Sequence, residues 1–279
     1  MEPSSTASIP HGIMYYMEFS PVSLEILQRV EEVTGAPVEV IFDGTLQVLA
    51  KIRMARSGQP SHLLRVQLNR PTPPDYFIAY ECGFILRLYE NPPGERFEFG
   101  ASEAGRAEVL RLLKIPGGLA QKLRLPDPAL VQHAGMLCGG LGTQLCSIPI
   151  GMRIDRWIYD TYPSLRQAQS SAINEQQRNN MQVLSPQIRA MSPTKVYTAS
   201  VSMNAAYALF CDELYGEGGY SVAYRTAGFA TQGAQLLERW REILPAPAHD
   251  RQLVDAWAGA LGLATWYQWV PLPAASGKP

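Results

Sequence analysis

Three short β-type runs lie between two helix-type segments within residues 20–90, and this order constrains the fold more than any other feature of the chain. Residues 37–42 form a β-branched run that Asp43-Gly44 closes, and residues 46–53 then alternate apolar with polar side chains, so we expect two strands with a glycine turn between them. Residues 64–68 alternate in the same way and predict a third strand. The pattern favours a small N-terminal sheet packed with helices.

The helices around these strands carry start and stop signals. Ser20-Pro21 precedes apolar positions spaced by three or four residues, and Gly35 follows the last of them, which is typical of a helix with proline in its first turn. Beyond the third strand, Asp75 is expected as the N-cap of a helix over residues 76–90, which Pro92-Pro93-Gly94 ends.

The helix expected over residues 76–90 has an unusually wide apolar surface. At about 100° per residue, Ile78, Cys82 and Ile85 share one face, and aromatic and aliphatic side chains extend that face sideways. Glu81 lies inside this apolar arc. We therefore expect the Glu81 carboxyl group to be at least partly buried.

The remaining sequence predicts mostly helices. A soft domain boundary is placed at Pro116-Gly117-Gly118, which gives an α+β domain over residues 12–115 and a mainly helical domain over residues 116–273. The run Gly139-Gly140-Leu141-Gly142 is expected to form a turn from helix to strand. A short strand is expected at 96–99, a helix is expected to begin at Ser102, and further helices are expected at 128–137, 155–162, 164–184, 199–215, 222–244 and 250–261.

Composition excludes several classes of function. The chain has 24 Lys and Arg residues against 25 Asp and Glu residues, so it carries no broad basic field, and nucleic acid is not an expected partner. The four cysteines have no CxxC spacing and lie in apolar segments, so we interpret them as reduced core thiols. The histidines are dispersed, and none of their spacings fits a standard zinc site.

The ends of the chain and its hydropathy predict a soluble, cytoplasmic protein without membrane contact. Residues 1–11 are polar and do not resemble a signal peptide, and we find no apolar stretch of about 18 residues. The first ten residues and residues 274–279 are expected to be frayed.

The segment Phe77-Ile78-Ala79-Tyr80-Glu81-Cys82-Gly83-Phe84-Ile85-Leu86 resembles the active-site helix of the minimal zinc metallopeptidases of the ImmA/IrrE kind. In that family, the helix carries His-Glu-Leu-Gly-His-Ile-Leu, in which two histidines hold Zn²⁺ and the glutamate activates the metal-bound water. Glu81, Gly83, Ile85 and Leu86 match this pattern. The resemblance covers about a quarter of the chain and implies a zincin-like fold for the N-terminal domain.

The chain departs from the family at both metal-ligand positions. Tyr80 and Phe84 stand where the histidines would be, and phenylalanine has no lone pair to give to a metal. We therefore expect no bound metal, no cofactor and no metallopeptidase activity, so that the protein is a pseudoenzyme acting through a protein partner. The resemblance implies a setting in bacterial stress, mobile-element or phage-linked regulation, where such peptidases act on repressor partners.

Other interpretations of the same residues stay open. One is a hydrolase whose metal-independent pocket is built around Glu81 and Tyr80 as catalytic residues. Whichever function holds, the expected binding residues are Tyr80, Glu81, Phe84 and Asn204. Others are a thiol site, a pair of carboxylates, or a helix whose lone glutamate is only a satisfied buried group. The thiol site would use Cys82, His62 and Glu81, and the carboxylate pair would join Glu81 to Asp212 or Glu213.

The two leading functions differ in the surface that they require. An interaction protein should expose an apolar or aromatic patch, whereas an enzyme should have a closed pocket with convergent polar groups. The unusually polar helix at 164–184 is a candidate surface for oligomerisation or for assembly into a larger complex.

Overall fold

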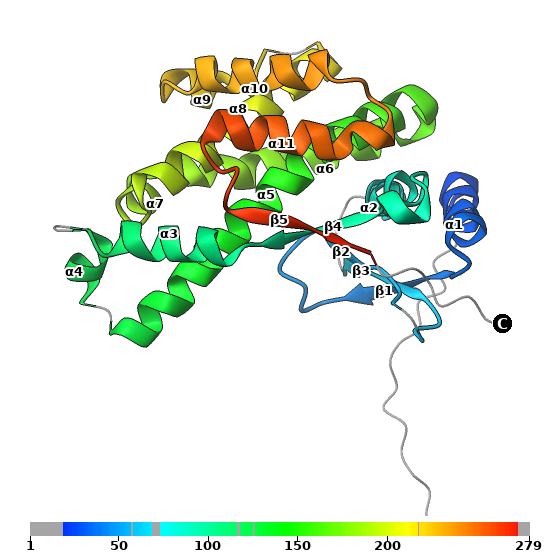
Figure 1. Cartoon of the computed structure of the whole chain (residues 1–279). Coiled ribbons are helices and arrows are strands. Elements are labelled where there is room, and N and C mark those ends of the chain that lie inside the picture. The colour runs from blue at the N-terminus through cyan, green and yellow to red at the C-terminus, as the bar shows by residue number, and fades with distance from the viewer. Residues whose placement is uncertain are drawn as a thin grey trace, which may run out of the picture.

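The computed structural model describes residues 19–56, 58–68, 73–115, 118–124, 126–216 and 218–272. The expectations for the first ten residues and for residues 274–279 fall outside these ranges. The described chain has an α+β fold, in which a small N-terminal sheet is followed by a mostly helical C-terminal half, as the sequence predicted (Figure 1). None of the described helices is long and apolar enough to span a bilayer.

The N-terminal sheet has three strands: β1 (Val38–Asp43), β2 (Ala50–Arg53) and β3 (His62–Gln67). Their order is β1-β3-β2, with β1 parallel and β2 antiparallel to the central β3. The first two strands are therefore not neighbours, although a turn at Asp43 does separate them. The second strand is also shorter than the alternation at 46–53 predicted.

Helices α1 (Pro21–Thr34) and α2 (Asp75–Tyr89) pack side by side against this sheet (Figure 1). The Ser20 side chain caps α1 by accepting a hydrogen bond from the Ser23 backbone N–H, and Gly35 ends the helix at a φ of 74°.

The expected N-cap role of Asp75 is wrong, because Asp75 is the first residue of α2 and its carboxylate faces α1. It accepts hydrogen bonds from Ser23 Oγ at 2.6 Å and from the Ser20 backbone N–H at 3.2 Å. Asp75 therefore fastens the start of α1 to the start of α2.

A second sheet joins distant parts of the chain. Strand β4 (Phe97–Ala101) pairs in antiparallel register with β5 (Tyr267–Pro271), so that Phe97 lies opposite Pro271 and Ala101 opposite Tyr267. The sequence predicted β4 but showed only an aromatic cluster at β5. Helix α3 (Glu103–Leu113) follows β4 close to the predicted start at Ser102, whose side chain caps it, and the short α4 (Leu119–Leu123) comes next.

The expected glycine turn at 139–142 is wrong, because α5 continues through it from Asp127 to Thr161. A Cβ on Gly142 would lie 2.9 Å from a ring carbon of Phe99, so the absence of a side chain lets β4 approach the helix closely. Pro149 also lies inside α5. The segments 128–137 and 155–162 are thus parts of a single long helix.

In the rest of the C-terminal half, the longer helices are α6 (Arg166–Met181), α8 (Thr194–Tyr215), α10 (Ala230–Glu242) and α11 (Asp250–Leu261), and the shorter ones are α7 (Pro186–Ala190) and α9 (Val222–Thr226). Of these, α6, α8 and α11 pack onto α5, and α10 packs onto α8 and α11. The helix expected over 222–244 is broken into α9 and α10 at Gly228, which has a φ of 84°.

Buried side chains from both sides of the expected boundary near residue 115 belong to one cluster. It joins Ile85 and Leu113 to Leu141, Met203 and Trp257. The two predicted domains therefore share a core in this structure, and the boundary itself stays a prediction.

The crossing of α10 over α8 provides a test of this packing. A Cβ on Gly233 would lie 2.8 Å from the Cβ of Ala205 and 3.0 Å from the backbone nitrogen of Ala206, which are atoms that cannot swing aside. We expect Gly233→Ala to lower the free energy of unfolding by about 1–3 kcal/mol, measured by urea titration. Gly259→Ala, whose Cβ would meet no atom within 4 Å on α11, should raise it by up to about 1 kcal/mol. Equal effects of the two substitutions would contradict this packing.

Candidate functional site

Tyr76, Tyr80 and Phe84 form an aromatic ladder along one side of α2. The ring centroids of Tyr76 and Tyr80 are 5.7 Å apart, and those of Tyr80 and Phe84 are 5.4 Å apart. The Tyr80 hydroxyl group lies so close to Gly151 of α5 that no Cβ would fit there. The two positions that would hold metal-binding histidines are therefore filled by rings packed against each other and against α5.

Glu81, next to this ladder, is partly buried, as the helical wheel predicted. Its Oε2 accepts a hydrogen bond of 3.2 Å from the backbone N–H of Ile52 in β2. Burial raises the pKa of Glu81 to about 7, although the Ile52 N–H and the charge of Lys51 both act to lower it. At neutral pH, the carboxyl group can thus both accept and release a proton.

A cavity of about 490 Å³, which we call the Glu81 cleft, lies between β2, α2 and α6. One wall is the segment that leads into β2, the second is the first half of α2, and the third is the polar helix α6. The residues that line it are Gln47, Val48, Leu49, Ala50, Tyr76, Phe77, Tyr80, Glu81, Gln176 and Asn179.

The outer edge of β2 faces this cleft. Within the described ranges, β2 pairs with β3 alone. Since the Ile52 N–H points away from β3 and towards Glu81, the peptide groups of Ala50, two residues earlier in the same strand, point outwards as well. The cleft therefore offers backbone hydrogen-bonding groups beside an ionisable carboxyl group.

Only two of the four predicted site residues line the Glu81 cleft. These are Tyr80 and Glu81, whereas Phe84, which contacts the Tyr80 ring, lines a different cavity. Asn204 is buried within α8 and lines neither of them.

Asp212 and Glu213, the alternative carboxylate partners for Glu81, have other contacts. Asp212 accepts hydrogen bonds from the backbone N–H groups of Tyr220 and Ser221, so it caps the turn after α8. Glu213 pairs with Arg241 of α10. Neither residue lines the Glu81 cleft.

The thiol site has no chemical support in this geometry. Cys82 is buried, and burial raises the pKa of its thiol group to about 12, so the nucleophilic thiolate is scarce at neutral pH. The ring nitrogens of His62 contact the Ala55 N–H and the Thr34 hydroxyl group, each at 3.0 Å, and burial lowers the pKa of the ring. Across the part of the chain that the structure covers, no three His, Cys, Asp or Glu side chains are grouped so that they could hold a metal ion.

Behind the ladder, the carboxylate of Asp155 is completely buried, and no local sequence pattern predicts this burial. It accepts hydrogen bonds from Tyr76 Oη at 2.9 Å, Tyr207 Oη at 3.0 Å and Gln169 Nε2 at 3.2 Å. Burial raises the pKa of Asp155 to about 6, against the lowering effect of these hydrogen bonds. The network connects α5 to α2, α8 and α6.

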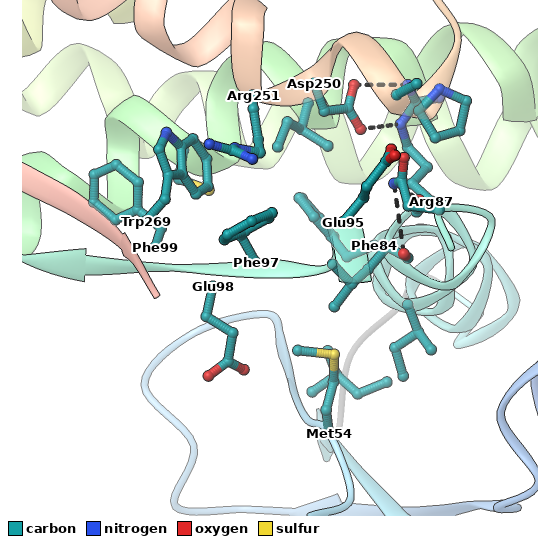
Figure 2. Close-up of a pocket in the computed structure, with 18 of the residues that line it drawn as sticks. Met54, Phe84, Arg87, Glu95, Phe97, Glu98, Phe99, Asp250, Arg251 and Trp269 are labelled. Carbon is teal, nitrogen blue, oxygen red and sulfur yellow. Dashed lines mark hydrogen bonds and ion pairs between the residues drawn. The ribbon is translucent and has the colours of Figure 1, made fainter. Parts of the chain in front are cut away.

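A larger cavity, of about 580 Å³, lies beyond the second half of α2, and we call it the Arg251 cavity (Figure 2). Its walls come from β2 and the loop after it, α2, β4, α5, β5 and the start of α11. The aromatic side chains that line it are Phe84, Phe97, Phe99 and Trp269, and the charged ones are Arg53, Arg56, Arg87, Glu95, Glu98, Asp250 and Arg251.

Sequence reasoning missed the Arg251 cavity because its parts lie far apart in the chain. The sequence shows a cluster of aromatic residues near 269. It does not show that this segment pairs with residues 97–101. An alternation of aromatic and polar residues at 267–270 was the available signal for a strand.

The raised pKa of Glu81 predicts how stability depends on pH. Because the folded-state pKa of about 7 lies above the ordinary value of 4.5, the folded chain holds this proton more tightly than the unfolded chain. The free energy of unfolding therefore falls as pH rises from about 4.5 to about 7. Glu81→Gln removes the ionisable group and keeps an oxygen that can accept the Ile52 N–H.

We compare the free energy of unfolding of Glu81→Gln with that of the unmodified chain. The value for the variant, relative to the unmodified chain, should rise by about 1–3 kcal/mol between pH 5 and pH 8, measured by urea unfolding at both pH values. Glu238→Gln, on the surface of α10, is the control and should change by less than about 0.5 kcal/mol. If the difference in free energy of unfolding between Glu81→Gln and the unmodified chain is the same at pH 5 and pH 8, Glu81 ionises normally.

Comparison with known proteins adds no family to these observations. No family model, no curated protein and no solved structure matches the chain. The resemblance to minimal zinc metallopeptidases therefore depends on the sequence pattern around Glu81.

Proposed function

We propose that this chain is a non-catalytic, zincin-like component that works by binding a protein partner, and that an extended segment of the partner occupies the Glu81 cleft. The observation that carries the proposal is the aromatic ladder, because Tyr80 and Phe84 fill both metal-ligand positions with packed rings. Such a helix retains its structural role in the fold and lacks the side chains that would bind zinc.

The chemistry of the two side chains supports the loss of zinc-dependent hydrolysis. Phe84 has no donor atom, and burial raises the pKa of Tyr80 well above its ordinary value, so its hydroxyl group stays protonated. A protonated phenol is a poor zinc ligand. Glu81 would then have no metal-bound water to activate.

The free edge of β2 supports an extended peptide as the occupant. A peptide that adds to a sheet edge gains backbone hydrogen bonds, and pockets beside the edge select its side chains. Ala50 provides the outward-facing peptide groups, and the cleft beside it provides the pocket. At its rim, Val48 is 51% exposed, so an apolar partner residue could cover it.

Helix α6 contributes the polar wall of the same cleft through Gln176 and Asn179. The polar sequence of this helix predicted a solvated or partner-facing element. We propose that it contacts the bound segment from the side opposite β2. A role in bacterial stress, mobile-element or phage-linked regulation is part of this proposal, and its support is the resemblance around Glu81.

A second candidate is a metal-independent hydrolase that uses the same cleft. The pKa of Glu81, raised to about 7, favours it because both protonation states are populated at neutral pH, as a general acid or base requires. Tyr80 lies beside Glu81, and because burial keeps its hydroxyl group protonated, it can contribute hydrogen bonds but not a proton. The two candidates differ in whether a bound peptide is cut.

The first test concerns the metal. The purified chain should contain well under one zinc ion per molecule after dialysis against micromolar zinc, measured by inductively coupled plasma mass spectrometry. It should also leave fluorescently labelled casein intact. One firmly bound metal ion per chain would contradict the proposal.

The second test uses a random dodecapeptide library displayed on phage and selected on the purified chain. We expect the selected peptides, once synthesised, to bind the unmodified chain and to bind Val48→Lys at least about tenfold more weakly, measured by fluorescence anisotropy. Val222→Lys is a matched control, because Val222 has a similar exposed fraction of 53% on α9 and should not affect binding.

Two further readouts separate the candidates. Bound peptide should slow hydrogen exchange at the Ala50 amide if the peptide adds to β2. Mass spectrometry should show intact peptides after incubation. Peptides cut by the unmodified chain and spared by Glu81→Gln would favour the hydrolase, and equal binding to both lysine variants would exclude this cleft as the binding site.

A further inference from the structure

The Arg251 cavity is separate from the Glu81 cleft and has no part in the function proposed above. It lies where β4 and β5 meet the second half of α2, and it also includes the start of α11 (Figure 2). Its volume of about 580 Å³ falls within the range of small-molecule sites.

The walls of this cavity are mainly apolar and aromatic. Phe84 and Leu88 come from α2, Phe97 from β4, Ile150 from α5 and Trp269 from β5. Such walls favour a ligand with a flat apolar body, because its burial removes apolar surface from water on both sides.

Arg251 provides the polar contact. Its guanidinium carbon lies 3.8 Å from the ring centroid of Phe97 and 5.5 Å from that of Trp269, so cation–π contacts hold it at the aromatic wall. Figure 2 shows the guanidinium group next to these two rings. With the residues described by the structure, Arg251 makes no hydrogen bond or ion pair, so its N–H donors can bind a ligand.

Most acidic groups around the cavity are already neutralised. Asp250 accepts hydrogen bonds from Arg87 at 2.7 and 2.8 Å and forms an ion pair with the buried Arg153 at 2.8 Å. Glu98 pairs with Arg56, and in Figure 2 it lies on the opposite side of β4 from Arg251. Glu95 is exposed. Among the charged residues that line the cavity, Arg251 is the one that lies over the Phe97 and Trp269 rings, and its charge favours an anion there.

We propose that the Arg251 cavity binds a small aromatic carboxylate, with its ring against Phe97 and Trp269 and its carboxylate group on the Arg251 guanidinium. A planar guanidinium can donate two parallel hydrogen bonds to a carboxylate. Binding is non-covalent: the Cys146 thiol at the wall has a pKa raised by burial to about 12, so it is not a nucleophile at neutral pH.

The test compares three naphthalene probes that differ in charge: 2-naphthoate, 2-naphthylmethanol and 2-naphthylmethylamine. Isothermal titration calorimetry on the full chain should show the tightest binding for the carboxylate. Arg251→Gln should weaken 2-naphthoate by roughly tenfold or more and leave the alcohol within about twofold. Arg189→Gln is the matched control, because Arg189 is also an exposed arginine near an aromatic ring, that of Tyr197 on α8.

A second variant, at another wall of the cavity, tests the binding site without changing Arg251. Leu88→Trp should fill the cavity and weaken all three probes, while Val48→Lys in the Glu81 cleft should affect none. The proposal is overturned if no probe binds, if the amine binds as tightly as the carboxylate, or if Arg251→Gln leaves 2-naphthoate binding unchanged. If the unmodified chain binds the amine more tightly than the carboxylate, and Glu95→Gln abolishes this preference, the cavity is a cation site.

Discussion

The buried carboxylate of Asp155 is the interaction on which the arrangement of the helices depends. It lies on α5 and accepts hydrogen bonds from Tyr76 on α2, Tyr207 on α8 and Gln169 on α6. A buried charge is tolerated only when it is hydrogen-bonded, so these partners and the carboxylate require one another. Tyr76 begins the aromatic ladder, and the network thereby fixes where Tyr80 and Glu81 lie.

Helix α2 then divides its surface between two cavities. Its first half, with Tyr80 and Glu81, lines the cleft at the free edge of β2, and its second half, with Phe84 and Arg87, lines the cavity at β4 and β5. The two sites differ in chemistry, because one offers backbone groups and a carboxyl group, and the other offers aromatic walls and a guanidinium group. A single helix therefore lines two separate cavities.

Features that depend on local spacing could be predicted from the sequence. The caps at Ser20 and Ser102 and the partial burial of Glu81 follow from residues within one turn of a helix. The continuity of α5 could not be predicted, because glycines 139, 140 and 142 disfavour helix locally, and packing such as that of Gly142 against Phe99 overrides this preference. The role of Arg251 depends on the pairing of β4 with β5, which no local pattern encodes.

That pairing has a consequence for how the chain reaches its folded state. Ser102 Oγ donates a hydrogen bond of 2.6 Å to the carbonyl of Thr265, so contacts here close a loop of 163 residues. Closing so long a loop costs entropy before the contact can offset it. The partner strand β5 follows all of the described helices in the chain, so the edge of β4 that pairs with β5 stays unpaired until these helices have been synthesised.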